Sequence, residues 1–256
     1  MGTQVALPIG VPMRPFCLLP AVALTLAVPT PAFAQATVPA PRAEPSLRTF
    51  FTDLADDARR LPSNQAATTV AFAGILSTSA STLDAQVALW DPEDEFKGGT
   101  WIGNSVVLAT GTLVTYGVAH WARMPRVKLV AVDVLRAQAL SLGLTYGLKY
   151  AVGRERPDHS SEDSFPSGHT AQTFASATVL ARYFGLPNAI PAFGVATYIA
   201  LSRLNQNRHF LSDVTFGAGI GIAVGWSATH GRGNWNIAPA LSRSERGVRV
   251  SYVSGS

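Results

Sequence analysis

Apolar residues recur with a helical period along most of the chain, and the pattern changes only near the C-terminus. Residues 46–60 place Leu47, Phe50, Phe51 and Leu54 on one helical face, with the charged residues elsewhere. Six further segments with a helical pattern follow, at about 64–80, 101–119, 127–150, 168–184, 189–204 and 211–229. The sequence therefore predicts an all-α fold: a six-helix core bundle preceded by an amphipathic helix.

Residues 231–256 have a different pattern from the rest of the chain. Residues 235–241 and 248–253 are typical of short strands, and residues 242–247 between them supply a polar turn. We therefore expect a small C-terminal β-hairpin, although the sequence does not indicate its role.

The N-terminal residues have the features of a secretory signal peptide. Arg14 precedes a short apolar run that Pro20 interrupts, and Ala32-Phe33-Ala34 fits a small-residue cleavage site. The expected division of the chain is a signal peptide at 1–34, a linker rich in proline and alanine at 35–45, a helical domain at 46–230 and the tail at 231–256.

Composition narrows the classes of function. Hydrophobic residues make up 47% of the chain and charged residues 14%, which indicates a large buried core, a membrane-embedded fold, or both. The formal net charge is +4, but the basic residues are scattered, so we expect no nucleic-acid partner. Cys17 is the one cysteine, and cleavage after Ala34 would leave no thiol for catalysis, a disulfide or a metal site.

One candidate binding element lies at the start of the segment 168–184. Pro166 disfavours helix before it, and Ser167 is a favourable N-cap. Gly168 and His169 then lie in the first helical turn, where unpaired N–H groups and the helix dipole attract anions. Because Gly168 also permits close approach of the backbone, this turn is predicted to bind phosphate.

A candidate catalytic pair lies at the start of the last helical segment. His209 and Asp213 are four residues apart and therefore share one helical face. A carboxylate beside an imidazole can hold the ring in one tautomer, which leaves the other nitrogen free to attack. His169 could then protonate the leaving alkoxide and later deprotonate water. The cations available to bind phosphate oxygens are Lys149, Arg156 and Arg203.

Together these clusters resemble the three-part signature of the type 2 phosphatidic acid phosphatase (PAP2) and vanadium haloperoxidase superfamily. The matching residues are Lys149 with six residues before Arg156-Pro157, then Pro166-Ser167-Gly168-His169, then Ser202-Arg203 with five residues before His209 and three before Asp213. No motif position is missing, and in helix order the resemblance covers about 64–229.

The resemblance implies a role for each matching residue. Phosphate would be bound by Lys149, Arg156, Ser167, Gly168 and Arg203. His209 would be the nucleophile, His169 the acid/base, and Asp213 a catalytic partner. No metal or other cofactor is implied, and vanadate is expected to bind the phosphate site as a mimic.

Two enzyme classes share this pocket. The first is a phosphatase that hydrolyses phosphate monoesters, soluble or lipid-linked, through a phosphohistidine intermediate. The second is a vanadium-dependent haloperoxidase, in which His209 would coordinate vanadate. Haloperoxidases of the superfamily are generally much longer, so the phosphatase is the favoured prediction.

The sequence gives conflicting signals about the membrane. Arg123, Arg126 and Lys128 would favour the cytoplasmic side in a six-span protein, whereas a cleaved signal peptide would place that loop outside the cytoplasm. The segment 127–150 also contains Asp133 and Arg136, as a helix of a soluble bundle would. We expect an exported, periplasmic domain that is soluble or membrane-associated. The alternative is an integral lipid phosphatase that acts on phosphatidate, phosphatidylglycerol phosphate or undecaprenyl pyrophosphate.

Overall fold

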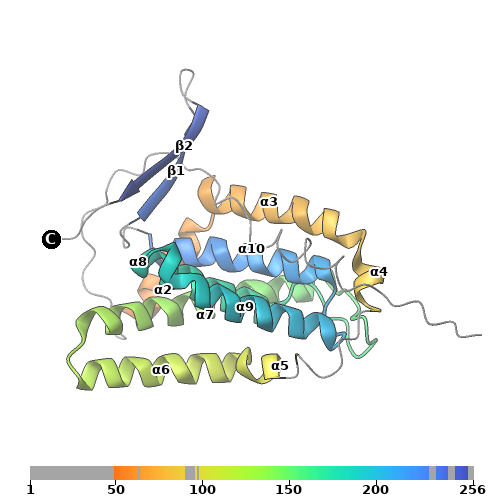
Figure 1. Ribbon diagram of the computed structural model, residues 1–256, viewed down its shortest axis with the longest axis horizontal. Coiled ribbons are helices and arrows are strands. Elements are labelled where there is room, and N and C mark those ends of the chain that lie inside the picture. Colours follow the sequence, from red (N-terminus) through yellow and green to blue (C-terminus); the bar gives the residue numbers. More distant parts are fainter. Residues whose placement is uncertain are drawn as a thin grey trace, which may run out of the picture.

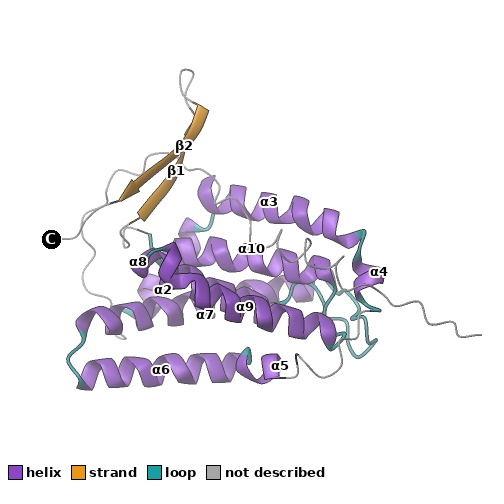
Figure 2. Ribbon diagram, viewed as in Figure 1, coloured by secondary structure: helices purple, strands orange, loops and turns teal. Residues whose placement is uncertain are grey.

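The computed structural model of the protein describes residues 49–62, 64–89, 96, 98–230, 235–241 and 246–252. The predicted signal peptide and linker lie outside these residues. The helices are α2 (Phe50–Arg60), α3 (Asn64–Ser81), α4 (Asp84–Val87), α5 (Gly98–Ile102), α6 (Ser105–Trp121), α7 (Pro125–Val152), α8 (Gly168–Phe184), α9 (Leu186–Asn205) and α10 (Leu211–Ala228). The prediction of an all-α fold is confirmed (Figures 1 and 2).

Helices α7, α8 and α10 form the centre of the bundle. Their shared core is made of small and branched side chains, including Val134, Ala137, Ala171, Ala175, Val179, Ile220 and Val224. Helix α3 packs on α10, α9 packs on α8, and α6 runs along α7 (Figure 1). The core is thus built by helix-on-helix packing around α8 and α10.

Helices α8 and α10 lie parallel and unusually close. A Cβ atom on Gly217 would lie 2.6 Å from the carbonyl oxygen of Ser167, and one on Gly221 would lie 2.3 Å from that of Ala171. Each step of four residues along α10 therefore matches a step of four along α8 in the same direction. Glycine is needed at both positions of α10 because any side chain would force the two helices apart.

The segment predicted as one helix at 101–119 is divided into α5 and α6. Gly103 lies at the break, and Asn104 begins α6 by accepting a hydrogen bond from Val106 N to its Oδ1 at 2.9 Å. A Cβ atom on Gly103 would lie 2.5 Å from Cγ2 of Ile199, so the break lets α5 pack tightly on α9. The other predicted core helices differ from the structure by a few residues at their ends.

Helix α2 is held by charge as well as by apolar contact. Phe51, assigned to the apolar face, is 78% exposed, whereas Asp57, assigned to the polar face, is fully buried. The reason is the fully buried Arg136, whose guanidinium lies 3.3 Å from Asp57 Oδ2, 2.7 Å from Asp133 Oδ1 and 3.2 Å from Asp53 Oδ2. A buried guanidinium needs such partners, and they turn the helix away from the predicted orientation.

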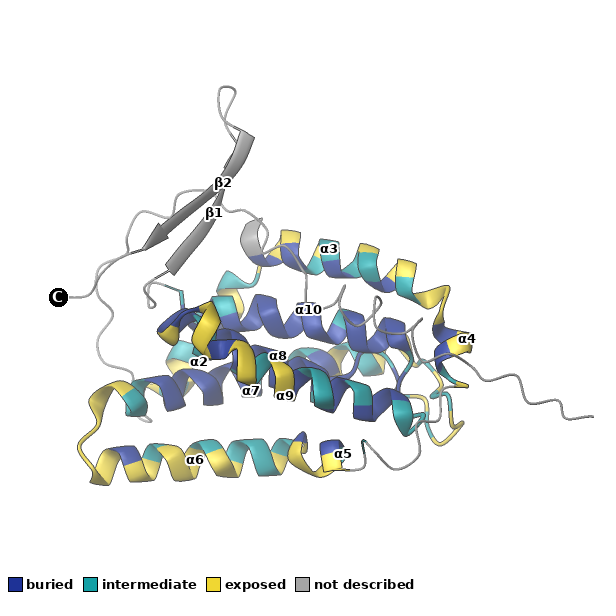
Figure 3. Ribbon diagram, in the orientation of Figure 1, coloured by how far each residue is buried: buried dark blue, intermediate teal, exposed yellow. Residues whose placement is uncertain are grey.

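Helix α6 leaves much of its apolar surface uncovered (Figure 3). The large apolar residues exposed on it are Val106, Leu113, Val114, Val118 and Trp121. Among the described residues, none of the helices combines the length and the hydropathy of a segment that crosses a membrane.

The C-terminal hairpin contains β1 (Trp235–Leu241) and β2 (Arg246–Tyr252), which pair antiparallel. The first strand matches the prediction, but the second begins two residues before the predicted start at 248. Pairing continues to Leu241 opposite Arg246.

Candidate active site

The three motif segments meet at one end of the bundle. The first follows the C-terminal part of α7, the second begins α8, and the third connects α9 to α10. Ser167 N donates to the carbonyl oxygen of Asp213 at 3.1 Å, and His209 N donates to that of Arg203 at 3.3 Å. Backbone hydrogen bonds therefore join the second motif to the third and, within the third, hold His209 against Arg203.

His209 has a defined tautomer. The side chain is buried, and Nδ1 lies 2.6 Å from the carbonyl oxygen of Ser164. Because a carbonyl oxygen only accepts, Nδ1 carries the hydrogen, and the lone pair is on Nε2. Asp213 Oδ2 is 3.9 Å from Nδ1, beyond hydrogen-bond distance. The carbonyl of Ser164 thus makes the contact to the ring that the spacing suggested for Asp213.

Asp213 instead fixes the loop that carries this carbonyl. Its Oδ2 accepts from Ser164 Oγ at 2.5 Å and from Phe210 N at 2.9 Å, and its Oδ1 accepts from Arg154 Nη1 at 2.6 Å. Burial raises the pKa of Asp213 above its ordinary value, although these hydrogen bonds and the charge of Arg154 act in the opposite direction. With three donors on two oxygens, the carboxylate acts on His209 through Ser164.

Arg154 is held by a second carboxylate that the motifs do not include. Asp84, on α4, accepts from Arg154 Nη2 at 2.9 Å, from Ser212 N at 2.9 Å and from Ser212 Oγ at 2.6 Å. Arg154 also lies over the ring of Phe210, 4.1 Å from its centroid. A continuous set of contacts therefore runs from Asp84 through Arg154 and Asp213 to the loop beneath His209.

Two of the predicted phosphate-binding cations share one counter-ion. Asp163 Oδ1 lies 2.8 Å from Arg156 Nε and its Oδ2 lies 3.0 Å from Arg156 Nη2. Lys149 Nζ donates to the carbonyl oxygen of Asp163 and lies 3.8 Å from its Oδ2. Burial lowers the pKa of Lys149. The charge of Asp163 raises this pKa, whereas the charges of Arg156 and Arg203 lower it further.

Arg203 is fixed from the other side of the site. Its Nη1 donates to Thr100 Oγ1 at 2.8 Å and to Gln206 Oε1 at 3.3 Å. Burial and the nearby charge of Arg156 lower the pKa of Arg203 to about 10, so the guanidinium is still charged at neutral pH. Thr100 comes from α5, which the sequence had not separated from α6.

Both histidines lie in the field of the same three cations. Burial, followed by the charges of Arg203, Lys149 and Arg156, lowers the pKa of His169 to about 4. Burial and the same three charges hold the pKa of His209 well below its ordinary value of 6.5. Both imidazoles thus lie within range of the charges of Lys149, Arg156 and Arg203. The structure therefore brings together the cations and histidines that the sequence predicted.

Ser167 and Gly168 occupy the predicted first turn of α8. Ser167 is buried with extended backbone, and its hydroxyl lies 3.0 Å from Thr170 Oγ1. A Cβ atom on Gly168 would lie 3.4 Å from Thr145 Oγ1, a tight but tolerable contact. The missing side chain of Gly168 therefore gives a ligand access to the backbone, and the N–H groups of the first helical turn can bind an anion there.

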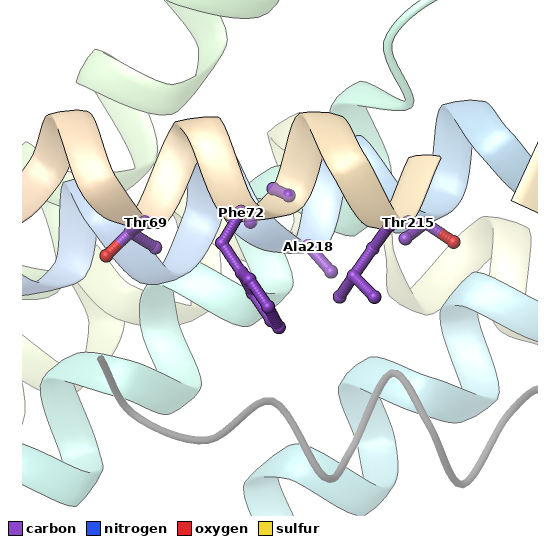
Figure 4. Close-up of a pocket in the computed structure, with 7 residues that line it drawn as sticks. Thr69, Phe72, Thr215 and Ala218 are labelled. Atoms are coloured by element: carbon purple, nitrogen blue, oxygen red, sulfur yellow. The ribbon is translucent and has the colours of Figure 1, made fainter. Parts of the chain in front are cut away.

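A hollow elsewhere in the molecule is not part of this site. It lies between α3 and α10 (Figure 4) and is lined by Thr69, Phe72, Ala73, Leu76, Thr215, Ala218 and Gly219. It contains no charged side chain and none of the predicted site residues, so phosphate would find no counter-charge there.

Several residues of the site escaped the sequence analysis, among them Asp163 and Ser164. Arg154 lies two positions before Arg156, and a second arginine so close to the motif was the available signal. Asp84 and Thr100 lie in segments with no motif, and only the fold brings them to the site. Gln206 lies within the third motif but at a position that the motif does not specify.

Comparison with known proteins agrees with the resemblance that the motifs carry. Residues 130–237 match the PAP2 superfamily, the family whose three-part signature the motifs resemble. Over 101 residues it is 41% identical to a lipid A 1-phosphatase of Porphyromonas gingivalis, a match that covers 38% of this chain and 22% of the relative. It is also 39% identical over 87 residues to a decaprenylphosphoryl-5-phosphoribose phosphatase of Mycobacterium tuberculosis, covering 30% of this chain and 48% of the relative.

The chain thus spans less than half the length of each of these two relatives. Among solved structures, it is similar to a transmembrane PAP2-type phosphatidylglycerolphosphate phosphatase from Bacillus subtilis. The sequence identity is 22% and the TM-score 0.45, with 71% of this chain and 92% of the other covered.

Proposed function

We propose that the protein is a phosphatase that hydrolyses lipid-linked phosphate monoesters through a phosphohistidine on His209. The observation that carries the proposal is the arrangement of two neutral imidazoles in the field of Lys149, Arg156 and Arg203, with Nε2 of His209 free for attack. A site that only bound phosphate would need the cations but neither a nucleophile nor an acid.

In the first half of the reaction, Nε2 of His209 attacks phosphorus and a P–N bond forms as the P–O bond to the alcohol breaks. His169 donates a proton to the departing oxygen, while the three cations neutralise charge on the phosphoryl oxygens. In the second half, His169 takes a proton from water, the resulting hydroxide oxygen bonds to phosphorus, and the P–N bond breaks. Phosphate leaves and His209 is again neutral.

The pKa of His169 links its protonation to substrate binding. In the empty site, burial and three cations lower this pKa to about 4, so the ring is neutral at physiological pH. A phosphate monoester brings about two negative charges at neutral pH and offsets the cations that disfavour the imidazolium. Binding should therefore raise the pKa of His169 and supply the general acid when a leaving group is present.

The lipid-linked class of substrate rests on similarity. The two relatives are named for phosphatases of lipid A and of a decaprenyl-linked sugar, and their matches are 41% and 39% identical. The exposed apolar residues of α6 would suit a protein that works at a membrane surface. We therefore propose an exported, membrane-associated enzyme that needs no metal, with vanadate bound at the phosphate site as an inhibitor.

The decisive test is His209→Asn in the full chain. Asparagine cannot form the covalent intermediate, so release of phosphate from phosphatidate in mixed micelles should fall at least a thousandfold, and 32P labelling should disappear. His159→Asn is the matched control, because His159 is exposed and pairs with Glu155 at 2.8 Å. Persistent labelling in His209→Asn, or loss of activity with EDTA, would refute the mechanism. Dye bromination with vanadate, peroxide and bromide tests the haloperoxidase alternative.

A further inference from the structure

A group of apolar residues borders the His169 side of the site. Trp101, Ile102 and Val106, here called the apolar lip, are 71%, 40% and 71% exposed. They lie on α5 and at the start of α6, within a stretch from 98 to 122 that contains no Asp, Glu, Lys or Arg. Three exposed apolar residues within six positions of a segment that contacts a cationic site suggest a binding surface.

The lip is firmly attached to the site. Thr100, next to Trp101, accepts a hydrogen bond from Arg203 Nη1 at 2.8 Å. A Cβ atom on Gly99 would lie 2.4 Å from Ser202 Oγ, so α5 packs directly against the residue that precedes Arg203. Trp101 therefore has its immediate chain neighbour bonded to a phosphate-binding side chain.

The lip also lies next to the proposed acid. A Cβ atom on Gly103 would lie 3.3 Å from Cδ2 of His169, so the chain at Gly103 lies close to the edge of that ring. Gln172 Nε2 donates to Ser105 Oγ at 2.8 Å, which ties the start of α6 to the first turns of α8. These contacts place the lip along the side of the site that His169 occupies.

The geometry of phosphoryl transfer indicates which part of the substrate lies near the apolar lip. In phosphoryl transfer the attacking and leaving atoms are roughly in line with phosphorus, so the alcohol departs on the side opposite His209. That is the side of His169, which must reach the departing oxygen to protonate it. The group attached to that oxygen is then on the side of the site where Gly103 lies close to His169.

We infer that the apolar lip binds the hydrocarbon part of the leaving alcohol, which makes Trp101 a specificity-determining residue for long-chain phosphate esters. This inference rests on the proposed function. A hydrocarbon chain that extends from the cationic site contacts the indole of Trp101, which removes apolar surface of both from water. A short polar alcohol does not reach the lip.

The test compares two substrates in Trp101→Ala. With dodecyl phosphate kept below its micelle concentration, kcat/KM is expected to fall about tenfold, as the loss of a modest apolar contact predicts. With glycerol 1-phosphate, kcat/KM should stay within about twofold, since no chain reaches the indole. Trp101→Phe should keep most of the activity on dodecyl phosphate.

Trp121→Ala is the matched control. Trp121 is 86% exposed and ends α6, about 30 Å along the helices from Trp101. It should leave both substrates unaffected. The inference is overturned by equal losses on both substrates in Trp101→Ala, by no loss on either, or by the same selective loss in Trp121→Ala. Failure of the unaltered protein to release phosphate from both esters would instead overturn the proposed function.

Discussion

The contacts beneath His209 predict that Asp84 is a positioning residue, although it lies about 125 residues away in the chain. The perturbation is Asp84→Asn, which keeps the size of the side chain and removes its charge. Asp84 accepts three hydrogen bonds, one of them from the Arg154 guanidinium, and its side chain is 9% exposed. Asparagine offers a single acceptor oxygen, and its NH2 group would face a donor.

The structure allows the cost to be worked out. A hydrogen bond to a charged group contributes about 1.5–3 kcal/mol when its partners are buried. Arg154 is 31% exposed and can be rehydrated in part, so we expect about 2 kcal/mol less free energy of unfolding. Arg154 would then hold Asp213 less firmly, and with it Ser164 and the ring of His209. A loss of alignment of this kind should lower kcat about tenfold to a hundredfold with little change in KM.

The assay combines urea unfolding with steady-state phosphate release. Asp56→Asn is the control, because Asp56 forms a similar ion pair with Arg59 at 3.0 Å but on the surface. That variant should lose less than about 0.5 kcal/mol and keep its kcat. If Asp84→Asn matches the control in both measurements, the positioning role of Asp84 is refuted. If stability falls while kcat is unchanged, Asp84 supports the fold alone, which also contradicts the positioning role.

Two further predictions follow from the pKa shifts and the close helix packing. The pKa of His169 is about 4 in the folded protein and 6.5 in the unfolded chain, so below pH 6.5 the unfolded state binds the extra proton. The free energy of unfolding should therefore decrease as pH falls from about 6.5 to about 4, and His169→Asn should reduce this slope in a urea series. Gly217→Ala should cost about 1–3 kcal/mol and reduce kcat, because its Cβ atom would lie 2.6 Å from the Ser167 carbonyl oxygen. Gly111→Ala is the control: nothing lies within 4 Å of its added Cβ atom, so the substitution should stabilise α6. Equal losses of stability in the two variants would contradict the packing argument.

Local sequence signals were sufficient to predict the helices that carry the motifs. Residues 168–184 were predicted as a helix and form α8, because Pro166 and Ser167 start it and Gly185 ends it. The hydrophobic period alone could not place α2, whose orientation depends on the buried guanidinium of Arg136. A pattern of apolar residues does not encode a charge pair between distant helices.

The same distinction applies to the site. Lys149, Arg203 and His209 were found because their side chains stand at fixed spacings in the chain. Asp84 and the carbonyl of Ser164 were missed because one is distant in sequence and the other is a backbone group, available on any residue. Contacts from a distant side chain or from a backbone carbonyl arise from tertiary packing, so a local sequence pattern cannot predict them.

The parallel packing of α8 and α10 explains why the site forms at this end. Parallel helices place both N-termini together, and each contributes partial positive charge and unpaired N–H groups. Ser167 at the start of α8 therefore contacts Asp213 in the first turn of α10, and His209 lies two residues before that helix begins. An antiparallel pair would have set a negative C-terminus against the phosphate. The glycines of α10 that permit the close parallel contact are thus part of what makes this end of the bundle favourable for an anion.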